Sequence, residues 1–378
     1  MPLLTARLAH FARASTSSSF TSTSFTTPLT LARTLATISS TPSSPTSPSF
    51  HIPVIDFSKF RAAATPAEKK ATAGEIVGAL KGAGFMYLAK HGIPEATVER
   101  AFAESRGFFG MPRERKVRDR LAWADPRSNR GYVAVGRERV TQSQDAAAIA
   151  AMREKAPDYK ESMEIGRDWD SVWPNQWPTD EELPTFKPFM LQFFQTCHEL
   201  HMVVMRSIAL GLDLQEDFFD DKIDKQCHNL RLLSYPPIKR AILDKDTDQA
   251  RAGAHSDYGT LTLLFQDQVG GLQVQNPHTG EYLPATPIPG TIVINVGDLL
   301  SRWSNDVLRS TLHRVVAPPA QAISETEAMT PARQSIAFFS NPNFDAEIEC
   351  LPNCGTTPKY PPVNTEKYIV GRLADTYV

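Results

Sequence analysis

The sequence predicts a mainly β protein with helical additions, built on a double-stranded β-helix, the jelly-roll core also found in cupins. Short apolar runs of strand length recur in the second half of the chain, at residues 258–267, 293–300 and 310–316. Two histidines and an aspartate, all potential metal ligands, lie beside or within these runs. Ligands grouped on strands in this way are typical of a jelly-roll metal site, so the two observations support one fold.

The run at 258–267 is followed by a Gly270-Gly271 pair and then by a second short strand at residues 272–275. Paired glycines between two strand patterns favour a tight turn. We therefore expect the two strands to form a hairpin with the metal ligands at its mouth.

His255, Asp257 and His313 form the set of two imidazoles and one carboxylate that holds Fe(II) by one face. The opposite face of the metal then stays open for substrate and oxygen. Downstream, Arg333 and Ser335 supply a guanidinium and a hydroxyl that can hold a carboxylate in the same barrel. We expect iron-dependent oxygenation of a small molecule in which 2-oxoglutarate and O2 are converted to succinate and CO2.

Strand alternation assigns the remaining pocket residues, because side chains two positions apart share a face. Phe339 lies on the face of Arg333 and Ser335, and Tyr235 lies on the face of Arg231. We expect Tyr235 to reach the carboxylate held by Arg333. Arg231 and Phe339 then project toward the substrate, which favours a flat heterocycle.

Three segments carry the apolar spacing of helices: residues 73–88 (running into a strand), 95–109 and 186–210. Gly211 is expected to end the last of these, which we expect to support the outside of the barrel. On this helix, His198 and His201 are expected to pack rather than to bind metal. Residues 111–182 are polar and lack periodicity, so we expect a segment that covers the pocket.

The chain is therefore divided into a tail, an N-terminal dioxygenase region with the pocket-covering segment, and a support helix with the catalytic core: residues 1–50, 51–182 and 183–378. The last two are expected to form one catalytic unit. The tail contains Arg7, Arg13 and Arg33 and many Ser and Thr, and the first acidic residue is Asp56. This composition is typical of a mitochondrial transit peptide. The alternative is a disordered tail on a cytoplasmic protein.

Composition limits the partners. The net charge of −2 offers no basic track for nucleic acid. No apolar run approaches the roughly 20 residues needed to cross a bilayer. The four cysteines are too few and too scattered for a disulfide framework and are expected to be thiols in a reducing compartment. The sequence leaves the oligomeric state open.

The order His-x-Asp, His, Arg-x-Ser, preceded by the run at 231–237, resembles the isopenicillin-N-synthase-like 2-oxoglutarate/Fe(II)-dependent dioxygenases. Within that family the likeness is greatest to the fungal thymine 7-hydroxylases (thymine dioxygenases). The segments that carry this likeness are residues 129–132, 136–142, 160–167, 251–255 and 302–306. The resemblance extends over roughly residues 50 to 375.

The resemblance implies that Phe339 stacks on a pyrimidine, that Arg231 meets its carbonyl edge and that Tyr258 lines the pocket. The pocket asparagine of the family falls on His228 here, whereas Asn229 is its neighbour and would take that place after a one-residue bulge. Ascorbate is expected to stimulate turnover. The expected substrate is thymine or a related pyrimidine; the alternatives are a fungal secondary metabolite, a small carboxylic acid, or a non-catalytic sensor that binds 2-oxoglutarate.

Overall fold

The computed structural model describes residues 50–377 apart from residues 62, 119–120, 123–127, 140–142, 144–145, 244–249 and 319–328. The predicted transit peptide lies outside the described residues. The unit described below is Phe50–Val378. In the described part of this unit, no helix has the length and apolar character required to span a membrane.

Two sheets form the core, and together they make the jelly roll. The larger sheet contains, in spatial order, β1 (Val54–Asp56), β2 (Phe85–Ala89), β10 (Thr291–Val296), β7 (Leu261–Gln266), β12 (Arg333–Ser340), β5 (Asn229–Tyr235), β4 (Glu161–Ile165) and β3 (Gly131–Val133). The smaller sheet contains β6 (Ala252–His255), β11 (His313–Val315), β8 (Leu272–Gln275) and β9 (Tyr282–Pro284). A separate ribbon pairs β13 (Glu347–Ile348) with β14 (Val363–Asn364). The predicted fold class is confirmed.

Apolar side chains from both sheets pack against one another. Tyr87 and Leu233 of the larger sheet share a buried cluster with Leu272, Val274 and Val315 of the smaller one. Burial of such aliphatic and aromatic side chains is the main force that holds two sheets face to face. The polar site described below lies in the same interior.

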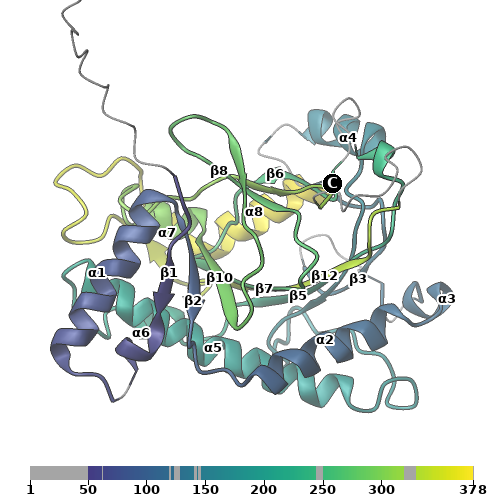
Figure 1. The fold of residues 1–378 in the computed structure, drawn as a ribbon, viewed down its shortest axis with the longest axis horizontal. Helices are drawn as coiled ribbons and strands as arrows, with labels where there is room; N and C mark the ends of the chain where they lie inside the picture. Colours follow the sequence, from purple (N-terminus) through teal and green to yellow (C-terminus); the bar gives the residue numbers. More distant parts are fainter. Residues whose placement is uncertain are drawn as a thin grey trace, which may run out of the picture. The chain divides into compact units, whose positions relative to one another are not determined.

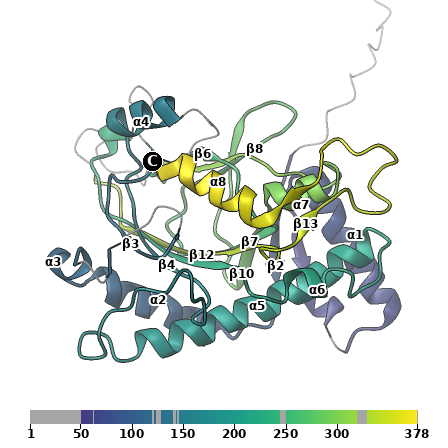
Figure 2. The ribbon, with the colours of Figure 1, turned by 180° about the vertical axis from the view of Figure 1, so that it is seen from behind.

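Helices cover the opposite face of the larger sheet. There α2 (Glu95–Phe109) and α5 (Phe186–Gly211) run along the strands, with α1 (Pro66–Gly82) beside them, whereas α8 (Thr365–Tyr377) lies on the other side (Figures 1 and 2). The shorter helices are η1 (Phe57–Phe60), α3 (Arg113–Lys116), α4 (Ala146–Lys155), α6 (Asp220–Ile223), η2 (Arg240–Ile242) and α7 (Asp298–Trp303).

The helix predicted over 186–210 is α5, and it ends where expected. A Cβ on Gly211 would lie 2.5 Å from the backbone oxygen of Ala73, so only glycine fits this contact with α1. The prediction for residues 95–109 matches α2. Helix α1 begins earlier than predicted, because Thr65 and Glu68 form a capping box around Pro66.

The predicted hairpin is wrong. Strand β7 pairs with β10 and β12, whereas β8 pairs with β11 and β9, so the Gly270-Gly271 turn carries the chain from one sheet to the other. Both glycines have positive φ angles, 80° and 96°. A Cβ on Gly271 would lie 2.6 Å from the carbonyl oxygen of Val316. The two glycines therefore allow the chain to pass close to the backbone of Val316 as it crosses from one sheet to the other.

Two further boundaries differ from expectation. The strand predicted over 293–300 ends at Val296, because Gly297 is the N-cap of α7. The segment 111–182 supplies β3 and β4, which extend the larger sheet beyond β5. Strand β4 escaped detection because it is rich in polar residues although it is fully buried, and β3 because it has only 3 residues. The cysteines Cys197, Cys227, Cys350 and Cys354 are free thiols.

Candidate active site

Strands β6 and β11 bring the three predicted metal ligands together. His255 ends β6 and pairs in register with His313 at the start of β11. The Nε2 atoms of His255 and His313 lie 3.8 and 3.7 Å from Oδ1 of Asp257. All three ligand atoms fall within 4.8 Å of one another, which is the spacing of donors that share one ion.

Hydrogen bonds aim these donors at a common point. Nδ1 of His255 donates to the carbonyl of Gly253 at 2.7 Å, and Nδ1 of His313 donates to the carbonyl of Thr311 at 3.2 Å. Since each proton is held on Nδ1, each Nε2 presents its lone pair to the centre.

The carboxylate of Asp257 is oriented in the same way. Its Oδ2 accepts from the hydroxyl of Thr262 at 2.5 Å and from Nδ2 of Asn295 at 2.8 Å, which leaves Oδ1 facing the two imidazoles. Burial and the neighbouring His313 lower the pKa of His255 to about 4. Burial alone would raise the pKa of Asp257, but the two histidines and these two hydrogen bonds lower it. At neutral pH the residues therefore fit a divalent metal.

A small cavity of about 60 Å³, here called the clamp cavity, opens on one side of the three ligands and is lined by Tyr235, Arg333 and Ser335. Arg333 is almost fully buried and donates from Nη1 to the hydroxyl of Ser335 at 3.2 Å. Its guanidinium lies 4.8 Å from the ring centroid of Tyr235. A second buried guanidinium nearby, that of Arg251, was not predicted from the sequence. Burial and the neighbouring Arg333 lower the pKa of Arg251 to about 10. Two neighbouring buried guanidinium groups favour a bound carboxylate.

A second cavity of about 70 Å³, here called the Tyr258 cavity, opens on the other side. It is lined by Tyr258, Asn229 and Asn129, and by Ile369 and Leu373 of α8. His255, Asp257, Arg231 and Phe339 line both cavities, so the metal ligands lie between them. A larger groove of about 1300 Å³ lies beside α2 but contains none of the three ligands.

Arg231 faces both cavities, as strand alternation predicts. It also contacts two carboxylates that were not predicted from the sequence. Its Nε lies 2.7 Å from the carboxylate of Glu164, and its Nη1 donates to Glu138 at 3.3 Å. Lys160 forms a buried ion pair with Glu138. The guanidinium also lies 5.2 Å from the ring centroid of Phe339. The sequence signals were the alternation of Lys160, Ser162 and Glu164 in a polar segment and the presence of residues 136–142 and 160–167 among the segments of the family resemblance.

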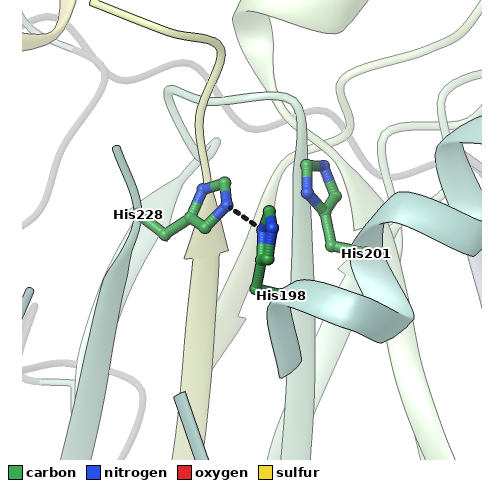
Figure 3. A group of neighbouring side chains, drawn as sticks. All are labelled: His198, His201 and His228. Atoms are coloured by element: carbon green, nitrogen blue, oxygen red, sulfur yellow. Dashed lines mark hydrogen bonds between the residues drawn. The ribbon is translucent and has the colours of Figure 1, made fainter. Parts of the chain in front are cut away.

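His228 lies outside both cavities. The pairing of β5 with β12 runs unbroken from Tyr235–Arg333 to Asn229–Phe339, so these seven pairs contain no bulge. Asn229 therefore shares the face of Arg231 directly, and the residue before it points the other way. There, His228 is buried against His198 and His201 of α5 (Figure 3). The prediction that His228 contacts the substrate is therefore wrong, because its side chain lines neither cavity.

His198, His201 and His228, here called the histidine cluster, are close enough to share an ion, but their hydrogen bonds disfavour one. The backbone N–H of Asn341 donates to Nδ1 of His228 at 3.0 Å, so the neutral ring carries its proton on Nε2. That proton is donated to Nδ1 of His198 at 3.0 Å (Figure 3). A metal at Nε2 of His228 would need the lone pair that this tautomer lacks. The cluster is therefore a packed, hydrogen-bonded group.

A jelly roll with two histidines and one carboxylate around an open metal position defines a mononuclear non-haem iron oxygenase. Residues 52–180 match the N-terminal family of non-haem dioxygenases in morphine synthesis, and residues 226–342 match the 2OG-Fe(II) oxygenase superfamily. The chain belongs to the 2OG-Fe(II) oxygenase superfamily and is an Fe(II)- and 2-oxoglutarate-dependent dioxygenase. The family resemblance predicted from the sequence is confirmed.

Three relatives show how this chain compares with known members of the family. The full-length thymine 7-hydroxylase of Neurospora crassa, solved with 2-oxoglutarate and thymine, is 46% identical with a TM-score of 0.77, over 85% of this chain and 96% of that one. A 2-oxoglutarate-Fe(II) type oxidoreductase of Metarhizium majus is 33% identical over 87% of this chain and 96% of its own length. A proline hydroxylase of Petromyces alliaceus is 35% identical over 79% of this chain and 89% of its own.

Proposed function

We propose that this dioxygenase hydroxylates a C–H bond of a small neutral heterocycle, with thymine or a related pyrimidine as the first candidate. The observation that carries the proposal is the Tyr258 cavity, which adjoins the metal ligands and is bounded by Phe339 and Tyr258. Aromatic walls with a few convergent polar groups suit a flat polar ring. The similarity to the thymine-bound Neurospora enzyme supports the pyrimidine choice.

In this proposal the clamp cavity binds 2-oxoglutarate and the Tyr258 cavity binds the substrate. Arg333 binds the distal carboxylate of 2-oxoglutarate, with Ser335 and Tyr235 beside it, because these groups form the buried cationic end of the clamp cavity. Nε2 of His255 and His313 and Oδ1 of Asp257 would hold Fe(II). When bound, Fe(II) supplies the activation of O2 that is coupled to oxidative decarboxylation of the cosubstrate.

The Tyr258 cavity then determines which C–H bond is presented to the metal. Phe339 and Tyr258 orient the ring, and Arg231, held by two carboxylates, contributes a fixed polar edge. Ile369 and Leu373 of α8 close the cavity on another side and help to exclude water. Exclusion of water matters because a reactive oxidant must meet the substrate C–H before solvent.

The test is succinate release by the full chain supplied with Fe(II), O2 and 2-oxoglutarate, with and without thymine, while products are followed by mass. Thymine-dependent succinate together with hydroxymethyluracil is the expected result. Succinate that forms slowly and independently of thymine would reject the pyrimidine and retain the dioxygenase. The same assay with and without ascorbate tests the proposed stimulation.

A second candidate is oxidation of a secondary metabolite, an amino-acid-derived one included. The amide that lines the cavity comes from Asn229 and not from position 228, where the family resemblance places it, and this difference beside the substrate favours the second candidate. The fungal oxidoreductase and proline hydroxylase relatives are consistent with it. Proline-dependent succinate without thymine-dependent succinate would select this alternative.

We also propose that residues 1–50 direct the protein to mitochondria, on the evidence of their arginine-containing, acid-free composition. Fusion of this segment to a fluorescent protein is expected to produce mitochondrial fluorescence. Diffuse cytoplasmic fluorescence of the fusion would reject the proposal.

A further inference from the structure

Two asparagines that line the Tyr258 cavity have buried carboxamide oxygens without a protein partner. Asn229 is 4% exposed and Asn129 is 9% exposed, and both line this cavity. In the described part of the chain, Oδ1 of neither residue accepts a hydrogen bond. A buried acceptor without a donor is costly, and native structures keep few of them. Two in one substrate cavity indicate that donors arrive with a ligand.

Glu164 fixes which end of the Asn229 amide faces the cavity. Its Oε2 accepts from Nδ2 of Asn229 at 2.7 Å, and its Oε1 accepts from the hydroxyl of Ser162 at 2.7 Å. Since an ionised carboxylate only accepts, the flipped amide would place Oδ1 against a carboxylate oxygen. The guanidinium of Arg231 lies against the other carboxylate oxygen of Glu164, with its Nε 2.7 Å from Oε1. Oδ1 of Asn229 is therefore held toward the cavity.

Arg231, which lines this cavity, and Lys160, which lines the clamp cavity, already have carboxylate partners. Arg231 pairs with Glu138 and Glu164, and Lys160 pairs with Glu138 and Asp158. An anionic substrate would have to compete with these buried carboxylates for the same guanidinium and ammonium groups. The charges thus favour a neutral substrate, and the orphaned oxygens favour one that carries N–H groups.

We propose that Asn129 and Asn229 form an acceptor pair that selects neutral substrates with N–H donors, such as lactams, imides and ureides, and that Glu164 positions Asn229 for this task. The inference rests on the proposed function, because it assigns specificity within the same cavity. It narrows the substrate class: N-methylated rings lose the contacts, and small carboxylic acids are disfavoured.

The test measures binding, not turnover, to the full chain loaded with Zn(II) and 2-oxoglutarate in place of Fe(II). Calorimetry compares thymine with 1,3-dimethylthymine, hydantoin with 1,3-dimethylhydantoin, and uracil with orotate, its carboxylated form. Each N–H probe is expected to bind about 10- to 100-fold more tightly than its dimethyl form, because methylation leaves buried acceptors unpaired. Orotate is expected to bind more weakly than uracil.

Variants separate hydrogen bonding from the bulk of the added methyl groups. In Asn229→Leu the preference for the N–H form should fall about 10-fold, whereas a purely steric preference would persist. In Glu164→Gln the preference should also fall, because a glutamine can donate to Oδ1 of Asn229 and so stabilise the flipped amide. Glu161→Gln is the matched control: Glu161 is buried on the same strand but binds Lys116 and the Tyr132 hydroxyl.

The outcomes separate this inference from the pyrimidine assignment. A preference for hydantoin over its dimethyl form, without binding of thymine, supports the acceptor pair and rejects the pyrimidine. Hydroxylation of thymine with equal binding of the methylated ring supports the pyrimidine and overturns the acceptor pair. If no N–H probe binds more tightly than its methylated form, or if Glu161→Gln loses the preference as fully as Glu164→Gln, the proposal is overturned.

Discussion

Acid should destabilise the fold through the histidine cluster, and the contribution of His201 can be worked out. Its ring is fully buried, and burial, with His198 beside it, lowers its pKa from 6.5 to about 3. The unfolded chain therefore binds a proton below pH 6.5 that the folded chain refuses. The stability that this residue contributes is present above pH 6.5 and is lost as the pH falls toward 3.

The magnitude follows from linkage. At pH 5 the unfolded imidazole gains about 2 kcal/mol from protonation, because 1.5 pH units below its ordinary pKa correspond to about 1.36 kcal/mol each. Substitution of His201 by leucine should remove this term. The hydroxyl of Thr260, which lies 3.2 Å from Nε2 of His201, keeps its own hydrogen bond to the carbonyl of Ser340.

Urea unfolding of the wild type and of His201→Leu at pH 7.5 and at pH 5.0 measures the difference. The variant should lose about 2 kcal/mol less of its free energy of unfolding between these two pH values than the wild type loses. His278→Asn, at an exposed position, is the control and should follow the wild type. Equal pH dependence of His201→Leu and the wild type would refute a ring held neutral by burial.

The other predictions concern the metal, the clamp and the sheet crossing. Asp257→Ala should abolish metal binding and turnover, and calorimetric titration with Fe(II) under nitrogen would expose any retained site. Thr262→Val should weaken the binding of Fe(II) about 10- to 100-fold in the same titration, because the hydroxyl of Thr262 orients the carboxylate of Asp257. Arg333→Gln should raise the KM for 2-oxoglutarate about 10- to 100-fold, and an unchanged KM would contradict the clamp. Gly271→Ala should cost about 2 kcal/mol or more in urea unfolding, because of its 96° φ and the close Val316 oxygen; no change would reject that crossing.

Sequence reasoning could predict the metal ligands and the faces of the strands because both depend on short spacings. His255 and Asp257 are separated by one residue, and the positions of Arg333, Ser335 and Phe339 follow from alternation on a single strand. Long amphipathic helices are predictable for the same reason, and α5 begins and ends close to its expected bounds. These features need no knowledge of which strand lies next to which.

Features that depend on distant pairing could not be predicted. Two glycines between strand patterns suit a hairpin and a crossing between sheets equally well, and only the partners β10, β12, β11 and β9 decide between them. The carboxylates of Glu138 and Glu164 are another case. They lie 93 and 67 residues before Arg231 in sequence, and nothing local to Arg231 reveals them.

His228 and Asn229 show how strand parity decides between neighbouring candidates. A residue three positions before Arg231 can share its face only if the strand contains a bulge, whereas a residue two positions before it shares that face by default. The unbroken register of β5 and β12 removes the bulge, so the amide in the cavity is that of Asn229. Its Nδ2 donates to Glu164, and within the described residues its Oδ1 has no donor. Strand parity therefore decides which of two neighbouring side chains can reach the cavity, and no local property of residues 228 and 229 separates them.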